Sequence, residues 1–148
     1  MPVNPELTER VFAKTSPYLV GREKVREFAR AVFATDPVSF NVEAARSAGH
    51  ADLVAPPTFA VVVQQLTLDQ LFADGDAGFV VEDVVHGEQR FISTRPIVAG
   101  DELTARLRVT SIKSLGGNAM LTAETEIQDA AGEPVVTAVA TLVVRADA

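Results

Sequence analysis

The segment 55–72, APPTFAVVVQQLTLDQLF, constrains the fold more than any other part of the chain. Pro56 and Pro57 suit the first turn of a helix, where a missing N–H costs little, and Thr58 can supply a capping oxygen. About 16 residues without a turn signal, roughly 24 Å as a helix, are too many for an ordinary strand. The three consecutive valines 61–63 also suit a strand, so periodicity leaves both structures open and length favours the helix. Because most of its circumference is apolar, we expect other elements to wrap around it.

A second helix is predicted upstream, at residues 22–35. Polar residues surround an apolar stripe at helical spacing, formed by Val25, Phe28, Ala29, Val32 and Phe33. We expect this helix to end before Asp36 and Pro37, because the residue before a proline avoids the helical region. The connection 36–54 that follows is irregular, with one helical turn at 41–46. A connection of this length between helices is commonly functional.

The second half of the chain has the pattern of β-strands. Strands are expected at 79–86, 89–95, 102–113, 118–128 and 134–145, with turns rich in Gly, Pro and Asp between them, and residues 18–20 can add a short one. The last strand is apolar on both faces, which indicates an interior position. Two helices before an antiparallel sheet give an α+β fold. We therefore predict a single hot-dog domain over residues 1–148, with about five strands wrapped around one long helix.

Composition excludes several classes of function. The chain has 148 residues, no cysteine and a net charge of −7 without a basic run, which argues against disulfides, thiolate metal sites and nucleic-acid binding. Two histidines without cysteine do not support a metal site, and no fingerprint for a nucleotide cofactor is present. No apolar run approaches the roughly 18 residues that cross a bilayer, and no signal segment is evident. We expect a cytoplasmic protein without cofactors.

Four segments in this order resemble the MaoC-like dehydratases. They are the amphipathic helix from residue 22, then FATDPVSFN at 33–41, SAGHADLVAPPTF at 47–59 and VHGEQRFISTRPIVAGDELT at 85–104. The chain is most similar to the actinobacterial branch that includes the small (3R)-hydroxyacyl-carrier-protein dehydratase subunits of mycolic acid synthesis. The resemblance covers roughly residues 18–144. It implies a site for an acyl chain carried as a thioester on phosphopantetheine.

The resemblance also implies which residues form that site. Active members use an aspartate and, five residues later, a histidine, because dehydration needs a base for the α-proton and an acid for the leaving hydroxyl. Asp36 matches the aspartate, but Asn41 stands at the histidine position, and a carboxamide cannot exchange a proton near neutral pH. Backbone N–H groups of Thr58 and Phe59 would stabilise the enolate oxygen. Pro57 departs from the family's common glycine and removes one such donor.

Each candidate also has a purely structural interpretation. Asp36 before a proline is a common turn former, and Asn41 is a good helix cap. Pro56 belongs to the helix start whether or not it contacts substrate. His86 either holds the sheet by a hydrogen bond or lies near the ligand. His50 could replace the missing acid, and Arg90 and Arg95 could contact a carrier phosphate, but surface or packing roles are more common for such side chains.

These observations lead to three hypotheses of function. The first is an acyl-thioester-binding protein of a (3R)-hydroxyacyl-thioester dehydratase or enoyl hydratase system, with Asp36 and Asn41 at the reacting groups and Pro56, Thr58, Phe59 and His86 at the substrate. The second is a non-catalytic subunit that requires a hot-dog partner with the complete dyad. The third is a thioesterase, although its usual helix carboxylate is not obvious because Asp69 lies near the far end. In each case the partner is acyl-CoA or an acyl-carrier protein, and we expect a homodimer or heterodimer joined at sheet edges.

Overall fold

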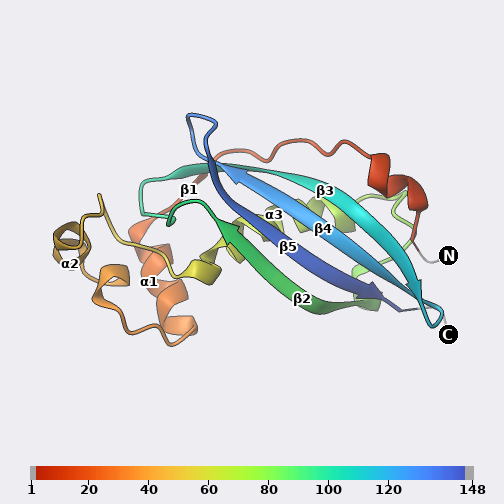
Figure 1. The fold of residues 1–148 in the computed structure, drawn as a ribbon, viewed down its shortest axis with the longest axis horizontal. Coiled ribbons are helices and arrows are strands. Elements are labelled where there is room, and N and C mark those ends of the chain that lie inside the picture. Colours follow the sequence, from red (N-terminus) through yellow and green to blue (C-terminus); the bar gives the residue numbers. More distant parts are fainter. Residues whose placement is uncertain (1–2, 146–148) are drawn as a thin grey trace.

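A curled five-stranded antiparallel sheet covers one long helix in the computed structural model, which describes residues 3–145 (Figure 1). The sheet order is β1-β3-β4-β5-β2. The strands are β1 (Tyr18–Leu19), β2 (Val84–Ser93), β3 (Glu102–Leu115), β4 (Asn118–Gln128) and β5 (Pro134–Val144). The helices are α1 (Arg22–Ala31), α2 (Val42–Ser47) and α3 (Ala60–Phe72), with 3₁₀ turns η1 (Pro5–Glu9), η2 (Pro37–Ser39), η3 (Pro57–Phe59) and η4 (Val81–Asp83). The predicted α+β hot-dog architecture is confirmed.

The central helix α3 is apolar over most of its surface, as its sequence predicts, but it begins later. Pro57 opens a 3₁₀ turn, and the α-helix starts only at Ala60. Thr58 lies inside that turn and makes no capping hydrogen bond, so the prediction of a Thr58 cap was wrong. The prolines set the backbone geometry of this turn without a side-chain cap.

The strands present alternate residues to α3. In β4 the residues 119, 121, 123, 125 and 127 are buried, whereas their neighbours are less buried, as expected for a sheet packed on one face. Strand β5 lies between β4 and β2 and is buried along most of both faces, which confirms its predicted interior position. The core therefore fills the space between α3 and the concave face of the sheet.

The prediction of two strands at 79–86 and 89–95 was wrong. A single strand, β2, covers most of this region, and residues 81–83 form the turn η4 instead. The pairing of β2 with β5 shifts register between His86 and Glu88, so Gly87 marks a β-bulge rather than a strand end. The sheet still has five strands because the short β1 pairs with β3.

Helix α1 ends sooner than its sequence pattern predicts. Val25 and Ala29 are buried, and Phe28 contacts Phe59 edge-on at a centroid distance of 5.3 Å. Phe33, predicted on the same face, instead has a left-handed backbone with φ of 60° and is 89 % exposed. Val32 is also exposed. Helix α1 therefore ends at Ala31, five residues before Asp36, and the connection toward α2 begins after it.

In Figure 1, α1 and α2 lie beyond one end of the sheet, and η1 lies at the opposite end. Within residues 3–145, no helix is both long and apolar enough to span a membrane.

Candidate functional site

A cavity of about 550 Å³ lies beside the N-terminal end of α3. Three stretches line it: residues between 34 and 39, residues between 54 and 60, and residues 93–97 at the end of β2, with Val136 of β5. Its volume lies in the range of small-molecule sites. Most of these side chains are apolar, and Asp36 and Arg95 are the two ionisable ones among them.

Backbone hydrogen bonds join the three stretches. The Val54 N–H donates to the Val38 carbonyl at 2.8 Å, and the Ala55 N–H donates to the Ile97 carbonyl at 2.8 Å. The buried Ser39 hydroxyl donates to the Val54 carbonyl at 2.6 Å. The cavity wall is therefore a set of irregular segments fixed mainly through the main chain, which leaves their side chains free to shape the interior.

Arg95 fixes the third stretch by binding two carboxylates. Its guanidinium donates to both Asp101 oxygens at 2.9 and 3.1 Å and to Asp129 at 3.3 Å. The hydrogen bonds to Asp101 raise the pKa of Arg95. The Glu133 N–H, and to a lesser degree Arg95, lowers the pKa of Asp129. Because two carboxylates already neutralise it, Arg95 holds the 96–101 turn in place rather than offering an unpaired cation to a phosphate.

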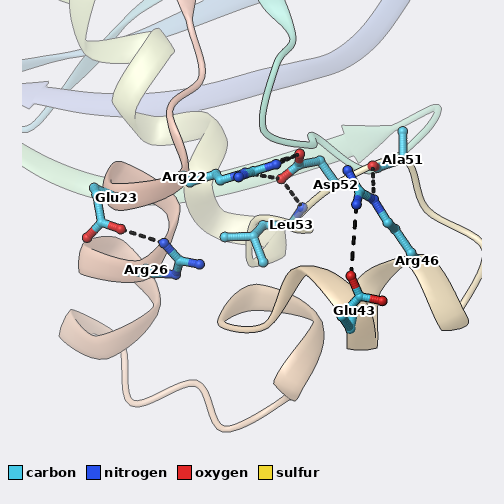
Figure 2. A network of polar contacts seen from close by, with 8 residues as sticks. All are labelled: Arg22, Glu23, Arg26, Glu43, Arg46, Ala51, Asp52 and Leu53. Atoms are coloured by element: carbon cyan, nitrogen blue, oxygen red, sulfur yellow. Dashed lines mark hydrogen bonds and ion pairs between the residues drawn. The ribbon is translucent and has the colours of Figure 1, made fainter.

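Figure 2 shows the polar contacts that attach residues 51–53, which we call the outer wall, to α1 and α2. Arg22 donates from Nε and Nη2 to the Asp52 carboxylate at 3.0 and 2.8 Å, and the Leu53 N–H donates to the same carboxylate at 2.7 Å. The Arg22 hydrogen bond lowers the pKa of Asp52. Arg46 of α2 donates to the Ala51 carbonyl at 3.3 Å. These bonds position the chain immediately before Val54, where it enters the cavity wall.

Of the two predicted catalytic residues, one lines the cavity. Asp36 does so, and its carboxylate also accepts the Val38 N–H at 3.1 Å as the cap of η2. Asn41 does not line it: the side chain is exposed and accepts the Ala44 N–H at 3.0 Å as the cap of α2. The structural interpretations of both residues, turn former and helix cap, are confirmed. Their catalytic roles stay predictions.

Some of the predicted substrate-binding residues line the cavity and others do not. Pro56 lines the cavity. Thr58 is exposed and does not line it, and Phe59 is fully buried in the core with its N–H donating to the Pro56 carbonyl at 2.9 Å. The Phe59 N–H is therefore not available to an enolate oxygen in this conformation.

The two histidines lie outside the cavity lining. His86 is exposed on β2 opposite Leu142, well before Ser93, the β2 residue that starts the cavity wall. His50 is partly buried just after α2. Arg90, considered as a phosphate contact, is exposed and lies 3.5 Å from Glu88. A role for His86 at the ligand stays a prediction.

The cavity suits binding better than proton transfer by this chain alone. Asp36 can accept a proton, but none of the other lining residues is a histidine, lysine or second carboxylate. Sequence reasoning missed Ala60, Ser93 and Val136, since nothing local marks such small or apolar residues as cavity lining. In residues 3–145 no three His, Asp or Glu side chains gather as metal ligands would.

Comparison with known proteins agrees with the hot-dog fold. A family model described as the FAS1-like dehydratase domain region matches residues 7–138. A UPF0336 protein of Leifsonia xyli subsp. xyli is 65 % identical over 147 residues, covering 99 % of each chain. A UPF0336 protein of Streptomyces avermitilis is 45 % identical over 146 residues, covering 99 % of this chain and 97 % of the relative.

Solved structures lead to the same family. A chain of the C-terminally truncated HadBC complex of Mycobacterium tuberculosis, a (3R)-hydroxyacyl-ACP dehydratase, has a TM-score of 0.77 and 33 % identity, with 89 % of this chain and 92 % of that chain covered. A MaoC-like dehydratase has a TM-score of 0.81 and 36 % identity, with 95 % of this chain and 43 % of that chain covered. The chain belongs to the MaoC-like dehydratases, through its match to the FAS1-like dehydratase domain region, and to the UPF0336 proteins.

Proposed function

We propose that this protein binds the acyl chain of a thioester for a (3R)-hydroxyacyl-thioester dehydratase or enoyl hydratase, and that a second hot-dog chain supplies the catalytic dyad. The observation that carries the proposal is the composition of the cavity. It is apolar, it contains Asp36, and the position where the family's histidine is expected holds Asn41, whose carboxamide caps α2 instead. A site with one carboxylate can hold an acyl thioester but lacks the acid–base pair.

The open edge of the sheet supports a hot-dog partner. Strand β2 is last in the sheet order, and no other strand among residues 3–145 pairs with its outer edge. Val85 and Ile92 on β2 are 53 % and 58 % exposed. An edge strand with exposed apolar residues is suited to pairing with another chain. The related HadBC structure is itself described as a complex.

Hydration of crotonyl-CoA and 2-octenoyl-CoA by the purified chain tests the proposal, together with direct titration of butyryl-CoA. We expect the wild type to bind acyl-CoA and to hydrate neither enoyl-CoA at a measurable rate, because loss of a general acid–base group costs about 10² to 10⁴ in rate. Asp36→Ala should keep acyl-CoA affinity. Gain of hydration in Asn41→His would support an otherwise intact site.

Two results would contradict the proposal in different ways. Full hydratase activity in the pure wild-type chain would remove the need for a partner. Absence of acyl-CoA binding would remove the binding role. Size-exclusion chromatography with light scattering checks the partner directly: a dimer, alone or after co-expression with a dyad-bearing hot-dog chain, is expected, and a monomer in both preparations would count against the edge-to-edge assembly.

A further inference from the structure

A layer of polar side chains crosses the core between α3 and the sheet. On the core face of α3, Ala60 and Val63 belong to one apolar cluster and Leu68 and Leu71 to another. Between them, Gln64 is 2 % exposed and Thr67 is 0 % exposed. On β4 the buried Thr125 likewise separates Ala123 from Ile127. We call Gln64, Thr67, Gln89 and Thr125 the polar layer.

The members of the polar layer satisfy one another. Gln64 Nε2 donates to Gln89 Oε1 at 2.9 Å, and Gln89 Nε2 donates back to Gln64 Oε1 at 2.8 Å. The Thr67 hydroxyl donates to the Gln64 carbonyl at 2.7 Å and lies 2.8 Å from the Thr125 hydroxyl. A reciprocal amide pair of this kind is stable while closed. Separating it leaves the buried Gln64 amide without a partner, whereas the partly exposed Gln89 amide also donates to the Arg90 carbonyl at 3.2 Å.

The polar layer lies just beyond the inner end of the cavity. Ala60 lines the cavity, and Gln64 is four residues further along α3, on the same helix face. Ser93 lines the cavity from β2, and Gln89 is four residues back on the same strand face, about 13 Å away. The Gln64–Gln89 pair therefore joins α3 to β2 in the packed core beyond the residues that line the cavity. Phe91, partly buried, lies between Gln89 and Ser93 on that strand.

We infer that the Gln64–Gln89 pair sets the length of acyl chain that the cavity accepts. This inference rests on the proposed function and adds its substrate class. A short chain ends on the apolar side of the polar layer, near Ala60 and Val136, without disturbing the amides. A long chain has to displace Phe91 and then separate the amide pair, with no hydrogen-bonding group of its own to offer. The preferred ligands are therefore short-chain acyl thioesters.

The test is the chain-length dependence of binding to the full chain. Calorimetric titration with butyryl-, octanoyl- and palmitoyl-CoA gives an affinity ratio of palmitoyl to butyryl for each variant. We expect Gln64→Ala to raise this ratio by at least about tenfold, because it removes the buried side chain that blocks a longer acyl chain beyond Ala60. Gln89→Ala removes the other partner, which is partly exposed on β2, and should also raise the ratio of palmitoyl to butyryl affinity. Gln65→Ala is the matched control, since Gln65 is exposed on the same helix and its side-chain amide donates to the exposed Asp69.

The outcomes separate the two proposals. An unchanged ratio in both glutamine variants, with butyryl-CoA still bound, would overturn the inference and leave the binding function standing. A wild type that already prefers palmitoyl-CoA would overturn it as well. If Gln64→Ala does not fold, Gln89→Ala decides the question. Titration with free fatty acids of the same lengths tests the cavity without the thioester; failure of the wild type to bind either series would remove the proposed function and the inference with it.

Discussion

The two halves of the core, on either side of the polar layer, are built differently. In the distal half, Leu68 and Leu71 of α3 pack against a sheet surface that the N-terminal segment also covers, with Val3 and Leu7 fully buried. In the half near α1, residues 34–60 form short turns and the short helix α2, and the cavity lies beside them. In both halves a segment inserts buried side chains into the core, such as Leu53 and Phe59 in the half near α1, but the irregular turns of the 34–60 segment also leave space for a ligand.

The largest effect is expected from opening the closed half. Leu71→Ala removes a fully buried side chain on α3 and should lower the free energy of unfolding by about 3 kcal/mol, because a cavity replaces close packing. Urea denaturation with an unchanged m-value measures the loss. Leu66→Ala on the same helix is the control, because Leu66 is 36 % exposed and should cost much less.

Acyl-CoA affinity of Leu71→Ala, measured where the variant is folded, then tests whether the halves are independent. We expect it to equal that of the wild type. A parallel fall in affinity and stability would mean that the polar layer does not separate the ligand cavity from the distal core.

The reverse change, a larger side chain in the cavity of the half near α1, should lower ligand affinity rather than stability. Ala60→Leu adds three carbons to a residue that lines the cavity. We expect acyl-CoA affinity to fall by about tenfold or more, equivalent to 1.4 kcal/mol or more. Stability should change by less than about 1 kcal/mol, since overpacking costs more only where no space exists. Titration calorimetry and urea denaturation measure the two quantities.

Ala73→Leu provides the matched control for this variant, because Ala73 is exposed at the other end of α3. Its affinity should not change. Equal loss of affinity in both variants, or a large loss of stability with retained affinity in Ala60→Leu, would contradict the assignment of the cavity as the acyl site.

The difference between the halves also explains how far the sequence predicts the molecule. The order of two helices before a sheet, and the enclosure of 55–72, follow from apolar patterning and segment length, and the structure confirms them. The site depends on long-range contacts that no local pattern contains. Arg95 meets Asp129 across 34 positions, and Gln64 meets Gln89 across 25.

Two errors of the sequence analysis have local causes. Gly87 looks like the end of a strand because glycine weakens strand pairing, yet the chain absorbs it as a bulge and continues. Phe33 continues the apolar stripe of α1, but its left-handed backbone ends that stripe and exposes the ring. The apolar pattern of the sequence is the same whether Gly87 ends a strand or forms a bulge, and whether Phe33 continues the helix or leaves it. Periodicity therefore could not distinguish these alternatives.

The smallest effect is expected from the outer wall of the open half, where Arg22 and Asp52 attach the 51–53 segment to α1. The Arg22 hydrogen bond holds the pKa of Asp52 below its ordinary value of 3.8. A lowered carboxyl pKa in the folded state stabilises the protein above the unfolded pKa, and that contribution disappears as pH falls through the folded value. Asp52→Asn should therefore cost less than about 1 kcal/mol near neutral pH, as exposed ion pairs do.

The same substitution should make no difference to stability in strong acid, where wild-type Asp52 is protonated, so the gap between the two proteins closes below about pH 4. Urea denaturation at neutral pH and in acid measures the gap. Glu23→Gln is the control. The Glu23 side chain pairs with Arg26, is 81 % exposed and is not among the residues that line the cavity. A gap that persists unchanged in acid would mean that Asp52 acts through packing or through the hydrogen bond that its side chain accepts from the Leu53 N–H, rather than through its charge.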